Sequence, residues 1–246
     1  MMNAGNSPLI YLRDVPLNMI VSAYQPYFAP HAGFFAKALL SDVLVLMDAV
    51  QFPQGRTWLT RNRFKNDQGI LRLSIPVWKR GLGRRNINEV KICYEGRWLK
   101  KNGESLITAY GKAPYFEDHA YFFEALFNER PERLVDLNLK IIRHINGFLG
   151  TGTKLILLSD LGVDADEPEL SVQVSKKLGA TAFLAQQSAR RYLDEEAFGK
   201  AGVNLQFFNP RPPVYPQLWG PFIPNLSILD MLFNVGPGAF RVIRRI

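Results

Sequence analysis

The order of apolar and polar positions over residues 19–47 predicts a strand, a helix and a second strand. Residues 19–23 form a short apolar run rich in strand-forming side chains, and two prolines interrupt the following segment, 24–30. Apolar residues then recur at helical spacing over 31–41, and 43–47 (VLVLM) is a continuous apolar run, as a strand buried on both faces requires. A strand, helix and strand in this order indicate a parallel βαβ unit.

Polar residues stand at the ends of both predicted strands. Tyr24 and Gln25 follow the first strand, and Asp48 and Gln51 follow the second. In open parallel sheets, ligands bind beyond the carboxyl ends of the strands. We therefore expect a ligand crevice here, in which Tyr24 and Asp48 take part in the chemistry and Gln25 and Gln51 bind the substrate.

The middle of the chain predicts a hairpin followed by helices. Residues 51–67 are polar and basic, and we interpret them as a loop with a short amphipathic piece. The alternating segments 71–77 and 87–93 predict two strands that pair as a hairpin. Helical patterns bounded by glycine and proline then predict a helical insertion, over 98–110, 115–127 and 131–148.

The alternation of strands and helices returns after residue 152 and predicts a mostly parallel sheet. The predicted strands are 155–158, 181–185 and 203–208, and the predicted helices are 168–178, 188–198 and 226–233. Gln186 and Asn209 follow two of these strands, so we expect them to bind substrate as well. The whole pattern predicts an α/β fold whose mostly parallel sheet opens with a βαβ unit and whose middle carries a helical insertion.

Length and composition are those of a globular protein. The chain has 246 residues, of which 47% are hydrophobic and 21% are charged. We expect an N-terminal extension over 1–18 and a single α/β domain over 19–246, with a helical subdomain at about 97–149. No apolar run approaches the roughly 18 residues of a membrane span, and the N-terminus lacks a signal-peptide pattern, which predicts a cytoplasmic protein. The formal net charge of +8 favours acidic partners.

The motifs of several common enzyme classes are absent from the sequence. It contains no GxGxxG after a strand, no GxxxxGK[ST] and no GxSxG, which argues against dinucleotide oxidoreductases, P-loop NTPases and α/β-hydrolases. We expect no cofactor. The single cysteine, Cys93, lies in an alternating segment, and we interpret it as a structural thiol. The three histidines lack metal-binding spacing, so we expect no metal site.

Candidate chemistry comes from a histidine, a carboxylate and a basic pair. His31 stands at the expected start of a helix, either as a general base or as a polar residue packed on the loop. Asp48 either orients an imidazole or binds a hydroxyl or a metal ion, or else it bonds the local backbone of a turn. Arg61-Asn62-Arg63 brings two guanidinium groups together, to bind phosphate or carboxylate or to form a solvated basic face.

Five segments spread over 19–236 carry a resemblance to a known family. In chain order they are YQPYFAPHAGFF, RNRFK, LITAYGKAPYF, DLN and YPQLWGPFIPNLSILDMLFNVG. Together they resemble the WbqC-like protein family. This resemblance implies a bacterial protein of surface-polysaccharide (O-antigen) or related biosynthesis, with transfer of an acyl or aminoacyl group as its suggested role. The family's opening motif usually reads His-Gln-Pro and is Tyr24-Gln25-Pro26 here, so we expect His31, which flanks the same loop, to replace that histidine.

The leading hypothesis is therefore a transferase that forms an amide or an ester. It would move an acyl or aminoacyl group from a carrier thioester to an amine or hydroxyl of an amino sugar or similar acceptor. His31 would be the base, Gln25 with Asn62 would bind the oxyanion, and Arg61 with Arg63 would bind the donor's phosphate. The expected partner is an acidic small molecule or the phosphopantetheine arm of a carrier protein.

Two other classes of function stay open. The first is a nucleotidyltransferase-like or sugar-nucleotide-binding enzyme, because His31-Ala32-Gly33 resembles part of the HxGH signature, although Phe34 stands in place of its second histidine. The second is a non-catalytic binding module for a carrier protein or nucleic acid. Nucleic acid is the less favoured partner, because no recognised RNA- or DNA-binding motif is present.

Overall fold

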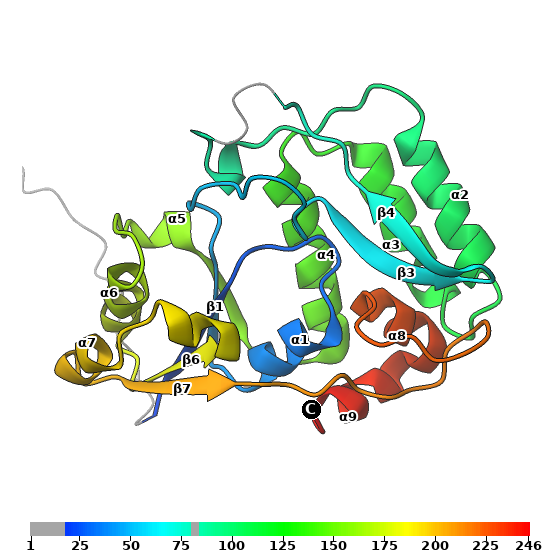
Figure 1. Ribbon diagram of the computed structural model, residues 1–246. Coiled ribbons are helices and arrows are strands. Elements are labelled where there is room, and N and C mark those ends of the chain that lie inside the picture. Colours follow the sequence, from blue (N-terminus) through cyan, green and yellow to red (C-terminus); the bar gives the residue numbers. More distant parts are fainter. Residues whose placement is uncertain (1–17, 80–83) are drawn as a thin grey trace, which may run out of the picture.

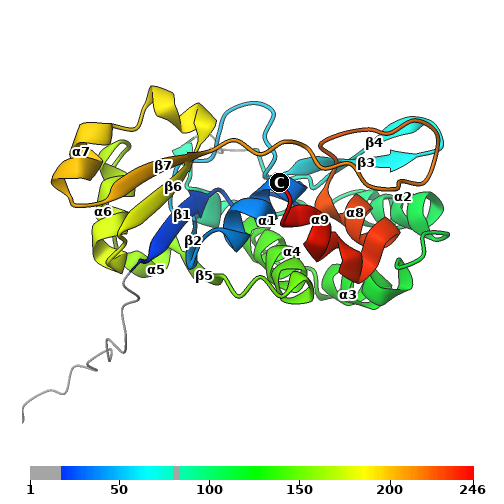
Figure 2. The ribbon, with the colours of Figure 1, turned by 90° about the horizontal axis from the view of Figure 1, so that it is seen from below.

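A five-stranded sheet in which every neighbouring pair of strands is parallel forms the centre of the fold (Figures 1 and 2). The computed structural model describes residues 18–79 and 84–246. Along the sheet the strands follow the order β5-β2-β1-β6-β7. They are β1 (Ile20–Tyr24), β2 (Val43–Leu46), β5 (Lys154–Leu157), β6 (Ala182–Gln186) and β7 (Asn204–Phe208). The predicted α/β fold with a mostly parallel sheet is confirmed.

The opening βαβ unit is confirmed as well. Helix α1 (Ala32–Leu39) connects β1 to β2, which lies beside β1 in parallel. Strand β2 is buried at every position, as its continuous apolar run predicts. Leu44 and Leu46 belong to one hydrophobic cluster and Val43 and Val45 to a second, so the two faces of the strand meet different cores.

Helices cover both faces of the sheet and supply these two cores. The larger core joins α1 to α4 (Leu134–Leu149) and α8 (Ile228–Val235). The smaller core lies under α6 (Glu169–Leu178) and α7 (Glu195–Lys200). The other helices are α2 (Trp98–Tyr110), α3 (Glu117–Glu129), α5 (Leu158–Leu161) and α9 (Ala239–Ile243), with short 3-10 turns η2 (Ile87–Glu89), η3 (Gln187–Arg191) and η4 (Gly236–Gly238). No helix of the described residues is long and apolar enough to cross a membrane.

The chain forms a hairpin in this region, but its strands are 61–66 and 69–74 and not the predicted 71–77 and 87–93. Strand β4 (Gly69–Ser74) pairs antiparallel with β3 (Arg61–Asn66), beside α2 (Figure 1). The predicted pairing of 71–77 with 87–93 is present only at its end, where Val77 and Ile92 form an isolated antiparallel bridge, and 87–89 is the turn η2. The turn at 66–69 is the physical reason why 61–66 pairs with 69–74. The Asn66 side chain accepts a hydrogen bond from the Gln68 backbone N–H at 3.0 Å, and Gly69 has a left-handed φ of 104°. Residues 61–66 are therefore a strand and not the predicted loop.

The predicted helix over 188–198 is divided in two. It is replaced by η3 and α7, with a break at residues 192–194. The Asp194 carboxylate accepts from the Glu196 backbone N–H at 2.9 Å, and this N-cap starts a new helix where the sequence pattern predicts a continuous one. The predicted N-terminal extension, 1–18, lies outside the described residues except for its last residue.

Candidate functional site

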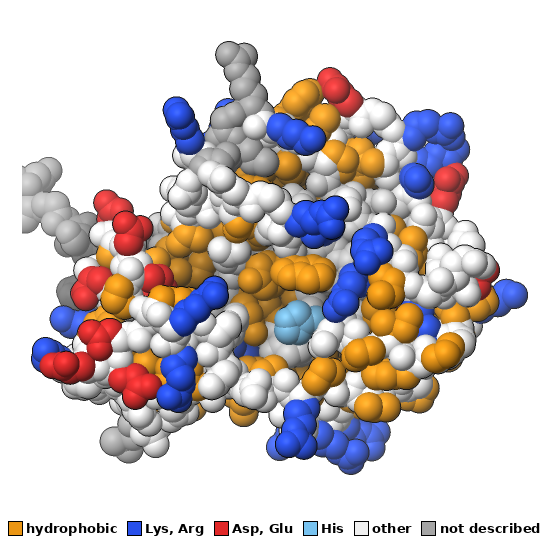
Figure 3. Space-filling model, viewed as in Figure 1, with side chains coloured by type: hydrophobic (Ala, Val, Ile, Leu, Met, Phe, Trp, Pro, Cys, Tyr) orange, Lys and Arg blue, Asp and Glu red, His pale blue; other side chains and the backbone are white. Residues whose placement is uncertain are grey.

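A pocket of about 550 Å³ opens at the carboxyl ends of β1 and β6. These strands are neighbours, but the chain leaves β1 towards β2 and β5 and leaves β6 towards β7 on the other side. The order of strands therefore reverses at this point, which is where open α/β sheets bind ligands. Figure 3 shows this face of the molecule hollowed in the middle, with hydrophobic side chains inside and Lys and Arg side chains nearby. We call this cavity the switch-point pocket.

The pocket contains a buried lysine. The side chain of Lys37, from α1, is among those that line the cavity, and only 1% of the residue is exposed. Its Nζ donates to the backbone oxygen of Ala23 at 2.8 Å and lies 4.2 Å from the centre of the Tyr24 ring. Among the described residues, no carboxylate lies within ion-pair distance of it. Burial accordingly lowers the pKa of Lys37 from 10.5 to about 7.

Polar and aromatic groups surround this amine. Tyr24 ends β1, and burial raises its pKa above the ordinary range of a tyrosine. Tyr27 lies edge-on to it, with ring centres 6.1 Å apart, and Tyr192 lines the same pocket. Gln25, Gln51, Gln186 and Arg191 also line the pocket, together with two acidic residues, Asp166 and Glu167. The structure thus brings together Tyr24, Gln25, Gln51 and Gln186 of the residues expected at the site.

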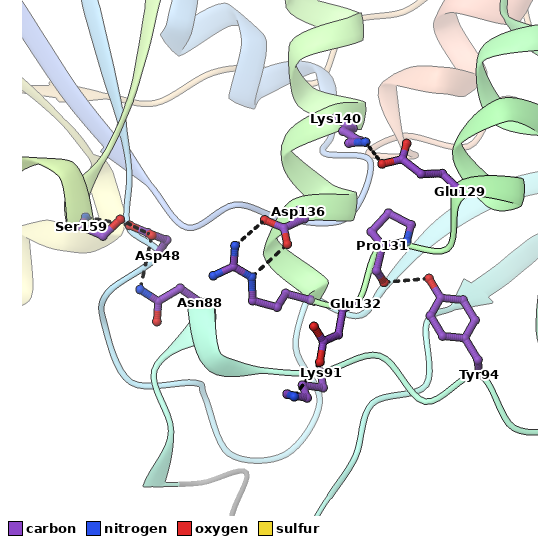
Figure 4. Close-up of polar contacts among 11 residues, drawn as sticks. Asp48, Asn88, Lys91, Tyr94, Glu129, Pro131, Glu132, Asp136, Lys140 and Ser159 are labelled. Atoms are coloured by element: carbon purple, nitrogen blue, oxygen red, sulfur yellow. Dashed lines mark hydrogen bonds and ion pairs between the residues drawn. The ribbon is translucent and has the colours of Figure 1, made fainter.

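Asp48 lies outside the pocket lining and is held in hydrogen bonds within the fold. Its carboxylate accepts from the Ser159 backbone N–H at 2.9 Å, from the Ser159 hydroxyl at 2.7 Å and from the Asn88 amide at 3.5 Å (Figure 4). These bonds join the end of β2 to α5 and to η2. The partners of the Asp48 carboxylate are therefore residues 111 and 40 positions away along the chain, and not the local backbone of its turn.

His31 lies next to a second, much smaller cavity, of about 40 Å³. It is the N-cap residue of α1, and its backbone bridges to Ser227. The imidazole folds over Gly33, where a Cβ would come within 3.0 Å of the ring. Burial, with the charge of Arg63 as a smaller cause, lowers the pKa of His31. This shift favours the neutral imidazole, but His31 does not line the switch-point pocket.

Arg61, Asn62 and Arg63 lie on β3 and line a third cavity, away from the switch-point pocket. Asn62 is buried, and its Nδ2 donates to the backbone oxygens of Phe28 at 2.9 Å and Ala29 at 2.6 Å. Its Oδ1 accepts from the Arg63 backbone N–H at 2.8 Å. Because both amide hydrogens are occupied, Asn62 has no donor left for an oxyanion.

Several of the segments that carry the family resemblance meet at one loop, residues 25–30. Asn62 holds its Phe28 and Ala29 carbonyls, the Ser227 hydroxyl donates to Ala29 at 2.8 Å, and Asn138 donates to Pro26 at 2.8 Å. Ala29 has a φ of 41°, a left-handed conformation that is strained for alanine. The surrounding hydrogen bonds fix this conformation, and the loop supplies Gln25 and Tyr27 to the pocket.

Sequence reasoning missed Lys37, and it placed Asn209 among the substrate-binding residues. The signal for Lys37 was a lysine inside AGFFAKALL, a segment apolar on all sides, because such a helix is buried all round. Asn209 follows β7 at the sheet edge, is exposed and does not line the switch-point pocket. Metal binding is a separate question. The described residues contain no group of three or more His, Cys, Asp or Glu side chains that could hold a metal ion.

Replacing Cys93 by alanine is expected to leave both fold and activity intact. The thiol is half-buried and lies outside the pocket, and its residue is held through the backbone, whose oxygen accepts from Trp98 Nε1 at 2.8 Å. We expect a loss of about 1 kcal/mol or less in denaturant unfolding. A folded Cys93→Ala protein without activity would show that the thiol acts as a nucleophile.

The fold and the pocket define an open-sheet α/β protein with a cavity at the point where the strand order reverses. The chain belongs to the WbqC-like protein family, whose model matches residues 25–242. It is 31% identical over 222 residues to the uncharacterized protein Rv1507c of Mycobacterium tuberculosis, in an alignment that covers 89% of this chain and 95% of that protein. No solved structure matches the chain.

Proposed function

We propose that this protein is a transferase whose reaction takes place in the switch-point pocket. It moves an acyl or aminoacyl group from a thioester donor to the amine or hydroxyl of an amino sugar or similar acceptor. The observation that carries the proposal is the amine of Lys37, which is buried in a pocket of about 550 Å³ without a carboxylate partner among the described residues. Burying an amine in this way is unfavourable, and such groups cluster at functional sites.

The proposed reaction needs a base, hydrogen-bond donors and an activated carbonyl. Neutral Lys37 takes the proton of the acceptor as its nitrogen or oxygen attacks the thioester carbon. The amides of Gln25 and Gln186, which line the pocket, donate to the oxyanion of the tetrahedral intermediate. The carbon–sulfur bond then breaks, and the thiolate leaves and takes up a proton. Lys37 thus takes the role that the sequence assigned to His31.

Membership in the WbqC-like family supports a setting in surface-polysaccharide or related biosynthesis. This part of the proposal rests on the context of that family. An amino sugar acceptor fits the pocket because its hydroxyl groups match the amide and phenol groups around Lys37.

The test uses acyl-coenzyme A as the thioester probe and a panel of amino sugars as acceptors. We expect the wild type to release free coenzyme A and to form an N-acyl or O-acyl product that mass spectrometry identifies. Gln25→Ala should slow the transfer about ten-fold or more, because it removes a donor to the oxyanion. Asn209→Ala is the matched control, an exposed amide after a strand but outside the pocket, and it should keep the wild-type rate. Equal rates in wild type and Gln25→Ala would count against this pocket as the reaction site.

A further inference from the structure

A separate concave surface on the β3–β4 hairpin has a composition unlike that of the switch-point pocket. Its volume is about 560 Å³, and Trp58 and Asn62 line it together with four arginines: Arg56, Arg61, Arg63 and Arg72. We call it the arginine cleft. It adjoins the loop 25–30, because Asn62 binds that loop and the Phe28 backbone N–H donates to the Trp58 oxygen at 2.9 Å.

The hairpin places three of these arginines on one face. Arg61 and Arg63 are two residues apart on β3, so their side chains point to the same side of the ribbon. Arg72 on β4 lies directly opposite Arg63. Like charges opposite each other destabilise a hairpin. Such an arrangement is stable when an anion lies between the guanidinium groups.

The protein itself supplies no such anion within the described residues. None of the four arginines has a carboxylate within 4.0 Å in the part of the chain that the structure describes. Arg63 Nη2 donates to the backbone oxygen of Asn225 at 2.8 Å, while its Nε is buried and has no hydrogen-bond partner. A buried N–H of a charged group without a partner is costly. Because no carboxylate of the described residues pairs with these four guanidinium groups, the cleft can bind an anion from outside.

Trp58 adds a second requirement for the ligand. Its side chain stays 45% exposed at the wall of the cleft, and the Arg63 guanidinium lies 5.5 Å from the ring centre. Guanidinium groups bind phosphate oxygens in pairs, and an exposed indole stacks on flat rings such as nucleobases. Because one guanidinium can bind one phosphate with two hydrogen bonds, several arginines can bind a ligand that has more than one phosphate.

We propose that the arginine cleft binds a nucleoside diphosphate group, with its phosphates on Arg61, Arg63 and Arg72 and its base on Trp58. Coenzyme A thioesters and sugar nucleotides both carry such a group, so the cleft would hold the nucleotide end of either. The inference does not depend on the proposed transfer, because nucleotide binding is measured without any reaction.

Isothermal titration calorimetry at fixed ionic strength tests the proposal with ADP, UDP, coenzyme A, pyrophosphate and adenosine. We expect ADP to bind much more tightly than adenosine. Arg63→Ala should weaken ADP binding about ten- to hundred-fold at a nearly unchanged melting temperature, with partial recovery in Arg63→Lys. Arg72→Ala, at an exposed position, should also weaken it about ten-fold, and it covers the case in which Arg63→Ala does not fold. Tighter binding of coenzyme A or of UDP than of ADP would support the proposal and identify the source of the group.

Trp58→Ala distinguishes the contribution of the nucleobase to binding from that of the phosphates. It should weaken ADP binding about five- to hundred-fold and leave pyrophosphate binding unchanged. Trp78→Ala, at a tryptophan that is 46% exposed, and Arg143→Ala, at an exposed arginine on α4, are the controls and should change neither affinity. The proposal is overturned if ADP binds no better than adenosine, if the controls weaken it equally, or if a single-stranded oligonucleotide binds while ADP does not. A normal transferase without nucleotide binding would refute only this inference.

Discussion

Replacing Lys37 by methionine is expected to stop the transfer reaction while making the protein more stable at pH 7. Methionine is similar in length and apolar, so it fills the same space without a charge to desolvate. Lowering the pKa of Lys37 from 10.5 to about 7 corresponds to a cost of about 5 kcal/mol for burying the charged amine. The lost bond to Ala23 offsets about 1 kcal/mol of the gain. We expect a net gain of about 4 kcal/mol in denaturant unfolding.

The difference in unfolding free energy between wild type and Lys37→Met should change with pH in a defined direction. The folded pKa of Lys37, about 7, lies below its unfolded value of 10.5, so the unfolded chain binds more protons between these two pH values. The wild type therefore becomes more stable relative to Lys37→Met as the pH rises from 7 towards 10, while the difference stays constant below pH 6. The transfer rate of the wild type should rise through pH 7, as neutral Lys37 forms.

Loss of a general base should reduce the transfer rate about 10²- to 10³-fold in Lys37→Met, with substrate affinity within a few-fold of wild type. Lys101→Met is the control, because Lys101 is an exposed lysine on α2. It should change neither the rate nor the pH dependence of unfolding. A Lys37→Met protein that is less stable than wild type at pH 7, or that transfers at the wild-type rate, would contradict the role assigned to this amine.

Asn62→Ala is expected to destabilise the protein by about 3 kcal/mol. The substitution leaves the buried Phe28 oxygen and the Arg63 backbone N–H without partners and removes one of two donors to the Ala29 oxygen. Each buried group that loses its partner costs about 1–3 kcal/mol. The strained φ of 41° at Ala29 then loses one of the bonds that hold it. For a chain of this length, the loss corresponds to a fall of about 6–12 °C in melting temperature.

Asn62→Asp tests the two donated hydrogen bonds apart from the accepted one. A carboxylate still accepts from the Arg63 backbone N–H but cannot donate to the Phe28 and Ala29 carbonyls. This substitution should be at least as destabilising as alanine. Asn204→Ala, at an exposed asparagine in β7, is the matched control and should change stability by less than about 0.5 kcal/mol. Because the loop also supplies Gln25 and Tyr27, Asn62→Ala should slow the transfer too. A loss below about 1 kcal/mol would show that other contacts suffice to hold the loop.

Local patterns in the sequence were enough to predict the sheet and the place of its crevice. The run 43–47 is apolar without a break, and only a strand covered on both faces satisfies it, so it appears as the buried strand β2. Tyr24 and Gln186 end the parallel strands β1 and β6, and Gln25 follows β1 directly; the carboxyl ends of parallel strands lie at one edge of the sheet. That geometry brought these three residues to the switch-point pocket without any knowledge of the packing.

Tertiary contacts decided which polar residues are available for chemistry. Asn138 and Pro26 are 112 residues apart in the chain and are joined by a hydrogen bond at 2.8 Å, and Asn62 is bound to Ala29 over 33 residues. Such partners depend on how whole elements pack, and they leave no trace in local spacing. Hydrogen bonds of this kind occupy the side chains of Asn62 and Asp48. Lys37, by contrast, is placed by α1 in the pocket, and none of the described carboxylates pairs with it. The sequence thus determined where the strands end, and only the packing of the hairpin and helices around them determined which side chains meet there.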